Sequence, residues 1–249
     1  MAALRVRTAL ALSAAALALA GCAASSAAEK RPDLPQVEAR VVEGTNAFRR
    51  ELGLAPVKRN ALLEETARSF AQYMARTGKF DHDADGSTPM ARAKAHGYDY
   101  CVVAENIARQ YSSRGFATAE LGRDLVQGWK DSPGHRRNMA DPAVTEIGVA
   151  IAHRSYQGLQ DYYAVQLFGR PASEAVHFSV RNETRSDVRY RVGEKAYTLG
   201  PRYSRTHTEC VTKALEFEAP AAKRFEVGNG DRYVAGVRGG ETTVLRDAR

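Results

Sequence analysis

His135 and Asn138 lie in a short segment, residues 128–139 (GWKDSPGHRRNM), whose residue types could serve a binding or catalytic site. Ser132 followed by Pro133 is typical of a helix start, because the Ser hydroxyl can accept a backbone amide and Pro needs no amide hydrogen at the first helical position. The spacing predicts that His135 and Asn138 share one face of a short helix. Such a pair can bind a ligand, or it can simply hydrogen-bond a neighbouring segment.

Two further segments carry side chains suited to chemistry. His82 closes the sequence GKFDH, and Glu105 and Asn106 open the sequence ENI. With His135, these segments supply two imidazoles and a carboxylate, which is the donor set of a zinc ion that keeps a fourth position open for water or ligand. The same side chains could instead form a hydrogen-bonded cluster that fixes loops against a sheet. The sequence leaves both interpretations open.

An acidic run beside His82 resembles the first half of a calcium-binding loop. Asp81, Asp83 and Asp85 alternate along the chain, and Gly86 holds the sixth position. The twelfth position, which should supply a bidentate Glu, is Arg92. Since this loop lacks its closing carboxylate, we predict an acidic turn between helices rather than a calcium site.

Nucleophilic catalysis is also disfavoured. We expect Ser132 to use its hydroxyl as a helix cap, which would occupy the oxygen that a nucleophile needs. Cys101 could form a thiolate pair with His135. Its neighbours Val102 and Val103 are apolar, however, and favour a buried or disulfide-bonded Cys.

The N-terminus is typical of an export signal. An apolar stretch, residues 9–20, follows two arginines and is shorter than the about 20 residues that a spanning helix requires. It ends in LAGC at residues 19–22, which resembles the lipobox of bacterial lipoproteins. That resemblance implies removal of residues 1–21 and lipidation of Cys22 as the first mature residue. An ordinary secretory signal or an uncleaved anchor are the alternatives, and all three place the protein outside the cytoplasm.

Export has consequences for Cys101 and Cys210 and for the residue that follows Cys22. Outside the cytoplasm Cys101 and Cys210 can form a disulfide, with two buried free thiols as the alternative. Ala23 follows the predicted lipidated Cys22, where an Asp would resemble an inner-membrane retention signal. In a cell with two membranes we therefore expect the outer membrane to hold the lipid.

The charge balance is basic, with 36 Lys and Arg against 29 Asp and Glu and a formal net charge of +7. The basic residues are scattered along the chain, whereas nucleic-acid binding needs a basic face. We expect no nucleic-acid partner. The balance fits a location beside anionic lipid or wall polymers, and equally an ordinary solvated surface.

The apolar pattern predicts an α+β organisation. Residues 22–35 lack periodicity and are expected to form a flexible tether. Residues 36–171 are expected to form one domain of helices around a hairpin-rich sheet, with a turn at Gln157 and Gly158. The expected helices are 36–54, the segment from Asn60 to Gly78, 87–97 and 116–129, and the expected strands are 147–151 and 162–168.

Residues 172–249 have a different character. Short runs of alternating apolar and polar residues are separated by Gly, Asn and Pro. This pattern predicts a small antiparallel β-rich accessory domain, either a sandwich or a barrel. No motif with chemical potential occurs in it.

The first domain contains a series of short motifs: NAFR at 46–49, GLAP at 53–56, Asn60, GKFDH at 78–82, AENIA at 104–108, the segment 129–138 and TEIGV at 145–149. In this order, the motifs are similar to those of the CAP superfamily, also called the SCP domain. The superfamily comprises cysteine-rich secretory, antigen 5 and pathogenesis-related proteins, and its bacterial branch is closest in pattern. The resemblance spans about residues 38–170 and excludes the β-rich C-terminus.

The resemblance implies an α-β-α sandwich with a cleft, in which plant and animal members carry two His and two Glu that can bind a divalent cation. His82 matches the first His of the family and Glu105 matches one Glu. The place of the second Glu is held by Ser132, and that of the second His by Ala143. We hypothesise that His135 replaces the missing His.

These observations favour a lipid-anchored cell-envelope protein whose cleft binds a lipid, glycan or peptide, with or without a divalent metal such as zinc. The candidate ligand-binding residues are His82, Glu105 and His135, supported by Asn106, Ser132 and Asn138. The alternative is a metal-dependent hydrolase of peptide or cell-wall substrates, in which the ion activates water and Glu105 acts as base. Loss of two family ligands favours binding, because catalysis needs ligands, base and substrate groups together.

Overall fold

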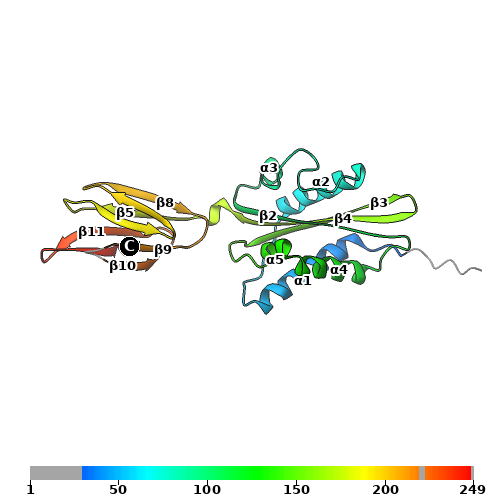
Figure 1. Cartoon of the computed structure of the whole chain (residues 1–249), viewed down its shortest axis with the longest axis horizontal. Coiled ribbons are helices and arrows are strands. Elements are labelled where there is room, and N and C mark those ends of the chain that lie inside the picture. Colours follow the sequence, from blue (N-terminus) through cyan, green and yellow to red (C-terminus); the bar gives the residue numbers. More distant parts are fainter. Residues whose placement is uncertain (1–29, 219–221, 248–249) are drawn as a thin grey trace, which may run out of the picture.

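The structure is a computed structural model that describes residues 30–218 and 222–247, as a helix-and-sheet unit followed by a unit of strands (Figure 1). None of the helices in these described residues is long and apolar enough to cross a membrane. The first unit contains α1 (Leu34–Glu51), β1 (Lys58–Arg59), α2 (Ala61–Thr77), α3 (Pro89–Ala95), β2 (Tyr100–Ser112), α4 (Thr118–Asp131), α5 (Pro133–Met139), β3 (Glu146–Tyr156), β4 (Leu159–Pro171) and the 3-10 turn η1 (Ala172–Glu174).

The first unit is an α-β-α sandwich, as the sequence predicts. Its sheet has the strand order β1-β3-β4-β2, so β2 is an edge strand. The pairs β3–β4 and β4–β2 are antiparallel, and β1–β3 is parallel. Helices α2 and α3 cover one face of the sheet, and α1, α4 and α5 cover the other (Figure 1).

Strand alternation divides the sheet between two cores. On β3, Ile147, Val149 and Ile151 pack towards α1 and α4, whereas Ala150 packs towards α2. Gly148 lies directly under α2, and a Cβ added there would stand 2.2 Å from the backbone carbon of Leu63. Each helix layer therefore buries its own apolar stripe, and glycine allows α2 to approach the sheet closely.

Local signals place the helix ends. Asn60 accepts hydrogen bonds from the amides of the first turn of α2, and Gly78 ends this helix with a φ of +73°. Helix α1 begins at Leu34 rather than at 36, because the Asp33 carboxylate accepts the Gln36 amide at 3.0 Å. Residues 34 and 35 therefore belong to the helix and not to the expected tether, of which residues 22–29 lie outside the described residues.

The hairpin prediction is confirmed. Gln157 and Gly158 connect β3 to β4 with φ values of +49° and +75°, and Tyr156 pairs with Leu159. Two successive residues with positive φ are typical of a turn whose twist matches that of the flanking strands. The sequence predicts no strand over residues 100–112, however, and here the structure has β2, which carries Glu105 and Asn106.

The C-terminal unit consists of two four-stranded sheets around one apolar core. All of its pairs are antiparallel except β5–β11, which is parallel. The expected fold class, an α-β-α sandwich followed by a β-rich region, is therefore confirmed. The strands are β5 (Val176–Asn182), β6 (Val188–Val192), β7 (Lys195–Leu199), β8 (Ser204–Glu209), β9 (Ala214–Phe217), β10 (Lys223–Glu226), β11 (Arg232–Arg238) and β12 (Glu241–Asp247).

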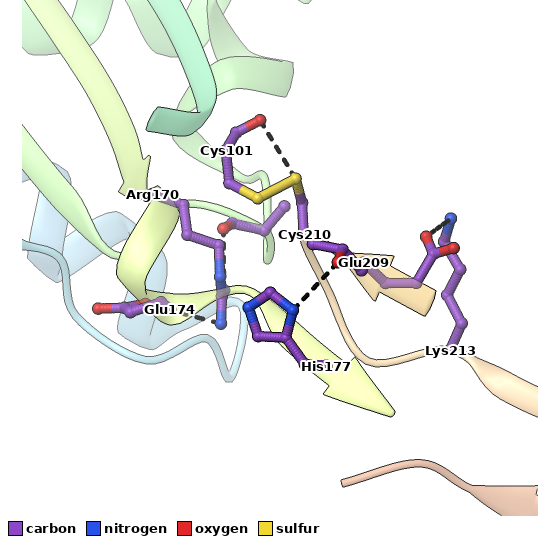
Figure 2. The surroundings of a disulfide bond; sticks show 9 residues. Cys101, Arg170, Glu174, His177, Glu209, Cys210 and Lys213 are labelled. Carbon is purple, nitrogen blue, oxygen red and sulfur yellow. Dashed lines mark hydrogen bonds and ion pairs between the residues drawn. A yellow bond between two sulfur atoms is a disulfide. The ribbon is translucent and has the colours of Figure 1, made fainter. Parts of the chain in front are cut away.

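A disulfide joins the two units. Cys101 on β2 and Cys210, which follows β8, are bonded at 2.05 Å with their Cα atoms 5.3 Å apart (Figure 2). The bridge connects residues 109 positions apart in the sequence. Cys101 is therefore engaged in a disulfide and is not the free thiolate that a pair with His135 would need.

Candidate functional site

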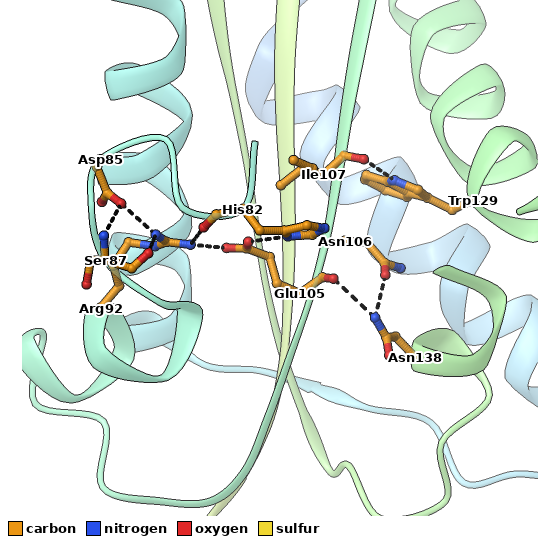
Figure 3. Close-up of polar contacts among 9 residues, drawn as sticks. All are labelled: His82, Asp85, Ser87, Arg92, Glu105, Asn106, Ile107, Trp129 and Asn138. Carbon is orange, nitrogen blue, oxygen red and sulfur yellow. Dashed lines mark hydrogen bonds and ion pairs between the residues drawn. The ribbon is translucent and has the colours of Figure 1, made fainter. Parts of the chain in front are cut away.

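Glu105 is the centre of the candidate site. Its side chain is 1% exposed, although it belongs to an edge strand. The Nδ1 atom of His82, in the turn after α2, lies 2.8 Å from Glu105 Oε1 (Figure 3). The His82 side chain is itself 48% exposed, so this imidazole connects a buried carboxylate to the surface. The structure thus brings together two of the three predicted ligand-binding residues.

Arg92 on α3 contacts the other carboxylate oxygen. Its Nη2 donates to Glu105 Oε2 at 2.9 Å and to the backbone oxygen of His82, also at 2.9 Å (Figure 3). The Arg92 side chain is only 7% exposed, and its guanidinium lies 3.5 Å from the centre of the Phe70 ring. A buried Glu thus has a buried cation and an imidazole as partners, one on each oxygen.

The same guanidinium also orders the acidic turn. Arg92 Nη1 donates to Asp85 Oδ1 and to the Ser87 carbonyl oxygen, both at 2.8 Å. The acidic turn predicted from the sequence is therefore present, with Arg92 as its internal cation. In an EF-hand-like loop this charge would come from calcium.

Asn106 points to the opposite face of the sheet, because consecutive strand residues alternate. Its Nδ2 donates to Gln166 Oε1 at 2.8 Å and to the His135 carbonyl oxygen at 3.2 Å. Asn138 on α5 donates to Asn106 Oδ1 at 2.8 Å and to the Glu105 carbonyl oxygen at 3.1 Å (Figure 3). The predicted supporting residues Asn106 and Asn138 therefore attach α5, and with it His135, to the strand that carries Glu105.

Buried polar contacts continue beyond Asn106. Gln166 on β4 donates to Thr45 Oγ1 at 2.8 Å, and Thr45 donates in turn to the Val41 carbonyl oxygen of α1. Asn106, Gln166 and Thr45 are all fully buried, so their hydrogen bonds have no competition from water. The network fixes the α1 layer against the same strands that position the site.

Ser132 differs from its predicted role. It occupies the N-cap position of α5, and Pro133 follows at the first helical position, but the Ser132 hydroxyl makes no capping hydrogen bond. Ser132 is also the C-cap residue of α4, so this single residue connects the two helices. Its carbonyl oxygen accepts the Arg136 amide at 2.8 Å. The expectation that backbone amides occupy this hydroxyl is wrong.

The two imidazoles have opposite pKa shifts. The hydrogen bond to Glu105 raises the pKa of His82 more than burial lowers it. Burial lowers the pKa of His135, and the nearby His82 lowers it further. The charge of His82 therefore contributes to the lowered pKa of His135.

These shifts predict a measurable order of titration. In an NMR pH titration we expect His82 to lose its proton at a higher pH than His135, and Glu105→Gln to lower the His82 pKa. Protonated His82 contributes stability that is complete below its unfolded pKa of about 6.5 and is lost as pH rises through the folded pKa. His135 has the opposite sign, so stability falls as pH decreases from about 6.5 through its lowered pKa. Asp81→Asn is the control, because Asp81 influences His82 less than Glu105 does. Equal pKa values for the two imidazoles would contradict this assignment.

The donor set does not fit the predicted zinc site. Both Glu105 oxygens are engaged, and one of them faces the Arg92 cation, which would repel a divalent ion placed there. Within residues 30–218 and 222–247, no group of three or more His, Cys, Asp or Glu could hold a metal ion. The alternative cluster interpretation fits better, because His82 and Glu105 are hydrogen-bonded partners that hold a loop on β2.

Residues 42–168 match the family model of CAP, the cysteine-rich secretory protein family. This match covers half of the chain, and the chain therefore belongs to that family, as the sequence motifs predict. The uncharacterized protein YkwD of Bacillus subtilis (strain 168) is 37% identical over 113 residues, which are 45% of this chain and 41% of YkwD. The chain thus spans less than half the length of this curated relative.

Solved structures with a similar fold include two bacterial proteins. An extracellular protein containing an SCP domain from Bacillus anthracis str. Ames is 23% identical with a TM-score of 0.46, and the similarity covers 55% of this chain and 41% of that one. An outer surface protein from Borrelia burgdorferi is 22% identical with a TM-score of 0.45, covering 55% of this chain and 93% of that one. In both cases the similarity extends over little more than half of this chain.

Proposed function

We propose that this CAP-domain chain is a cell-envelope protein, anchored by lipid on Cys22, that binds an envelope ligand at the His82 site without a metal ion. The His82 site comprises His82, Glu105 and Arg92. The observation that carries the proposal is the engagement of both Glu105 oxygens, by His82 at 2.8 Å and by Arg92 at 2.9 Å. His82 and Arg92 already compensate the negative charge of Glu105. The carboxylate therefore holds these two side chains in place, which supports a fixed binding surface.

Cell-envelope location is supported by the lipobox-like sequence at residues 19–22, which lies outside the described residues. The Cys101–Cys210 bridge is compatible with it, because disulfides persist in oxidising compartments outside the cytoplasm. Lipid anchoring gives the chain a membrane as its first partner. In a cell with two membranes, Ala23 after the lipidated Cys favours the outer one.

The anchor predicts detergent partitioning. Expressed in a bacterial host with lipoprotein processing, the full chain should enter the detergent phase of a Triton X-114 extraction and incorporate labelled palmitate. Cys22→Ala should abolish both properties, because it removes the acylated thiol. Ser25→Ala, a nearby change that spares the thiol, should leave both intact. Palmitate labelling that survives Cys22→Ala would contradict the proposed anchor.

The chemistry of the exposed face of His82 defines the ligand class. Its Nδ1 is directed at Glu105, so Nε2 remains for a ligand. Its pKa is raised, which favours the charged form that donates to an anionic group. Phe80, two residues before His82, and Met90 on α3 are exposed hydrophobic residues. We infer an envelope peptide or glycan that carries a carboxylate, with anionic lipid as the alternative.

The test is a titration of the purified full chain with soluble peptidoglycan fragments released by muramidase digestion. Phosphatidylglycerol vesicles are the second probe. We expect the fragments to bind and His82→Ala to weaken binding by about tenfold, the equivalent of one charged hydrogen bond. His96→Ala, at the end of α3, is the matched control. Failure of both probes to bind, or equal binding by His82→Ala, would overturn the proposal.

The hydrolase alternative is less well supported by the geometry. A general base needs a free lone pair within hydrogen-bonding reach of the proton that it abstracts. Glu105 is 1% exposed and both its oxygens already have partners. The fragments should therefore be recovered uncleaved. Cleavage that disappears in both His82→Ala and Glu105→Ala would instead support the hydrolase.

A further inference from the structure

The C-terminal unit contains a cavity of about 640 Å³ on the outer face of β11 and β12. Tyr233, Ala235 and Val244 of these strands point into the core. Val234 and Leu245 alternate with them and therefore line the outer face, where they contribute to the cavity wall. This cavity belongs to the C-terminal unit, whereas the His82 site lies in the first, so the two are separate features of the molecule.

Three arginines surround this apolar floor: Arg185, Arg202 and Arg238. In the part of the chain that the structure describes, none of their guanidinium groups has a side-chain hydrogen bond or an ion pair. The acidic residue at the cavity, Glu183, is paired with Arg181 at 3.2 Å. Three cationic groups thus remain uncompensated around one cavity.

Buried hydrogen bonds fix the backbone near two of these arginines. Asn182 is 0% exposed, and its Nδ2 donates to the carbonyl oxygens of Ser186 and Leu199, both at 2.8 Å. The first contact fixes the turn that carries Arg185. The second fixes the end of β7, just before the turn in which Arg202 adopts a φ of +65°. A single buried amide therefore holds the backbone of both turns, so the freedom lost when a ligand binds is mainly that of the exposed arginine side chains.

We propose that this arginine pocket, lined by Arg185, Arg202 and Arg238, binds a phosphate monoester. A phosphomonoester carries a charge of about −1.5 to −2 and three acceptor oxygens, which several guanidinium groups can share. Arginine suits this task because its planar fork matches phosphate oxygens in a bidentate way. Val234 and Leu245 provide the floor for the carbon chain that carries the phosphate. The phosphate could come from a lipid headgroup or from a soluble or polymer-borne ester.

The test uses the full chain with glycerol 3-phosphate and with phosphatidylcholine vesicles that contain or lack phosphatidic acid. We expect glycerol 3-phosphate to bind, and Arg185→Gln/Arg202→Gln to weaken binding by about tenfold or more. Arg189→Gln, an exposed arginine of β6 in the opposite sheet, is the matched control. Unchanged thermal melting of the double variant shows that a loss of binding is not a loss of fold.

The two probes distinguish a lipid headgroup from a soluble or polymer-borne phosphate ester. Binding of glycerol 3-phosphate and of phosphatidic acid vesicles supports a lipid headgroup, and binding of glycerol 3-phosphate alone supports a soluble or polymer-borne ester. Absence of glycerol 3-phosphate binding, or equal weakening by Arg189→Gln, would overturn the proposal, since only non-specific attraction would remain. His82→Ala should not affect this binding, so its result is independent of the proposed His82 site.

Discussion

Replacing Arg92 with methionine should lower the free energy of unfolding by about 3–5 kcal/mol, because it leaves buried Glu105 without its cation. The guanidinium donates to Glu105, to Asp85 and to the carbonyl oxygens of His82 and Ser87. Its loss therefore leaves several acceptors and one buried carboxylate without a hydrogen-bond donor, in an environment that cannot solvate them. Urea denaturation of the purified protein measures the difference.

Two further variants make this prediction specific. Arg123→Met removes an arginine whose side chain is 70% exposed, and should change stability by no more than about 0.5 kcal/mol. The double variant Arg92→Met/Glu105→Gln should be more stable than Arg92→Met alone, since it no longer buries an unpaired carboxylate. If Arg92→Met and Arg123→Met unfold at the same urea concentration, Arg92 does not compensate Glu105.

Asn106→Ala should cost about 3 kcal/mol of unfolding free energy, because it leaves several buried groups without partners. The side chain is 0% exposed and contacts Gln166, Asn138 and the His135 carbonyl oxygen. The change should also alter the NMR signal of the His135 imidazole, because Asn106 and Asn138 attach α5 to β2.

Asn229→Ala provides the control for Asn106. Asn229 is exposed in the C-terminal unit, where its side chain accepts the His177 amide. Its substitution should change the free energy of unfolding by about 0.5–1.5 kcal/mol, the value of one hydrogen bond. A cost for Asn106→Ala as small as that for Asn229→Ala would mean that the buried network contributes little.

The elements that the sequence predicts well are those with local signals. Asn60 and Gly78 delimit α2, and the turn at Gln157 and Gly158 is found where expected. Each of these signals acts within a few residues through a cap or a positive φ. The apolar stripe of α2 and the alternation of β3 are likewise local patterns, and they predict the layer to which each element belongs.

Strand β2 could not be predicted in this way. Glu105 and Asn106 interrupt its apolar residues, and polar residues in succession are atypical of a buried strand. They are tolerated because their partners come from other elements: His82 and Arg92 for Glu105, and Gln166 for Asn106. These partners lie 13 to 60 residues away in the chain, so no local pattern indicates them.

The candidate site was predicted in part. Glu105 and His82 do come together, and Asn138 supports them as expected. The role of Arg92 was missed, although its position opposite the acidic turn was a usable signal. In the sequence its charge only argued against calcium. In the folded chain Arg92 pairs with Asp85 of that turn and with Glu105 on β2.

The most direct test of the account is metal analysis of the purified full chain, combined with a calorimetric zinc titration. His82 and Arg92 each bond one oxygen of Glu105, so we infer that no divalent ion is needed at the His82 site. We therefore expect no stoichiometric metal and no saturable heat from zinc, for the natural sequence and for His135→Ala alike. One equivalent of zinc that is bound by the natural chain and lost in both His82→Ala and His135→Ala would contradict the account.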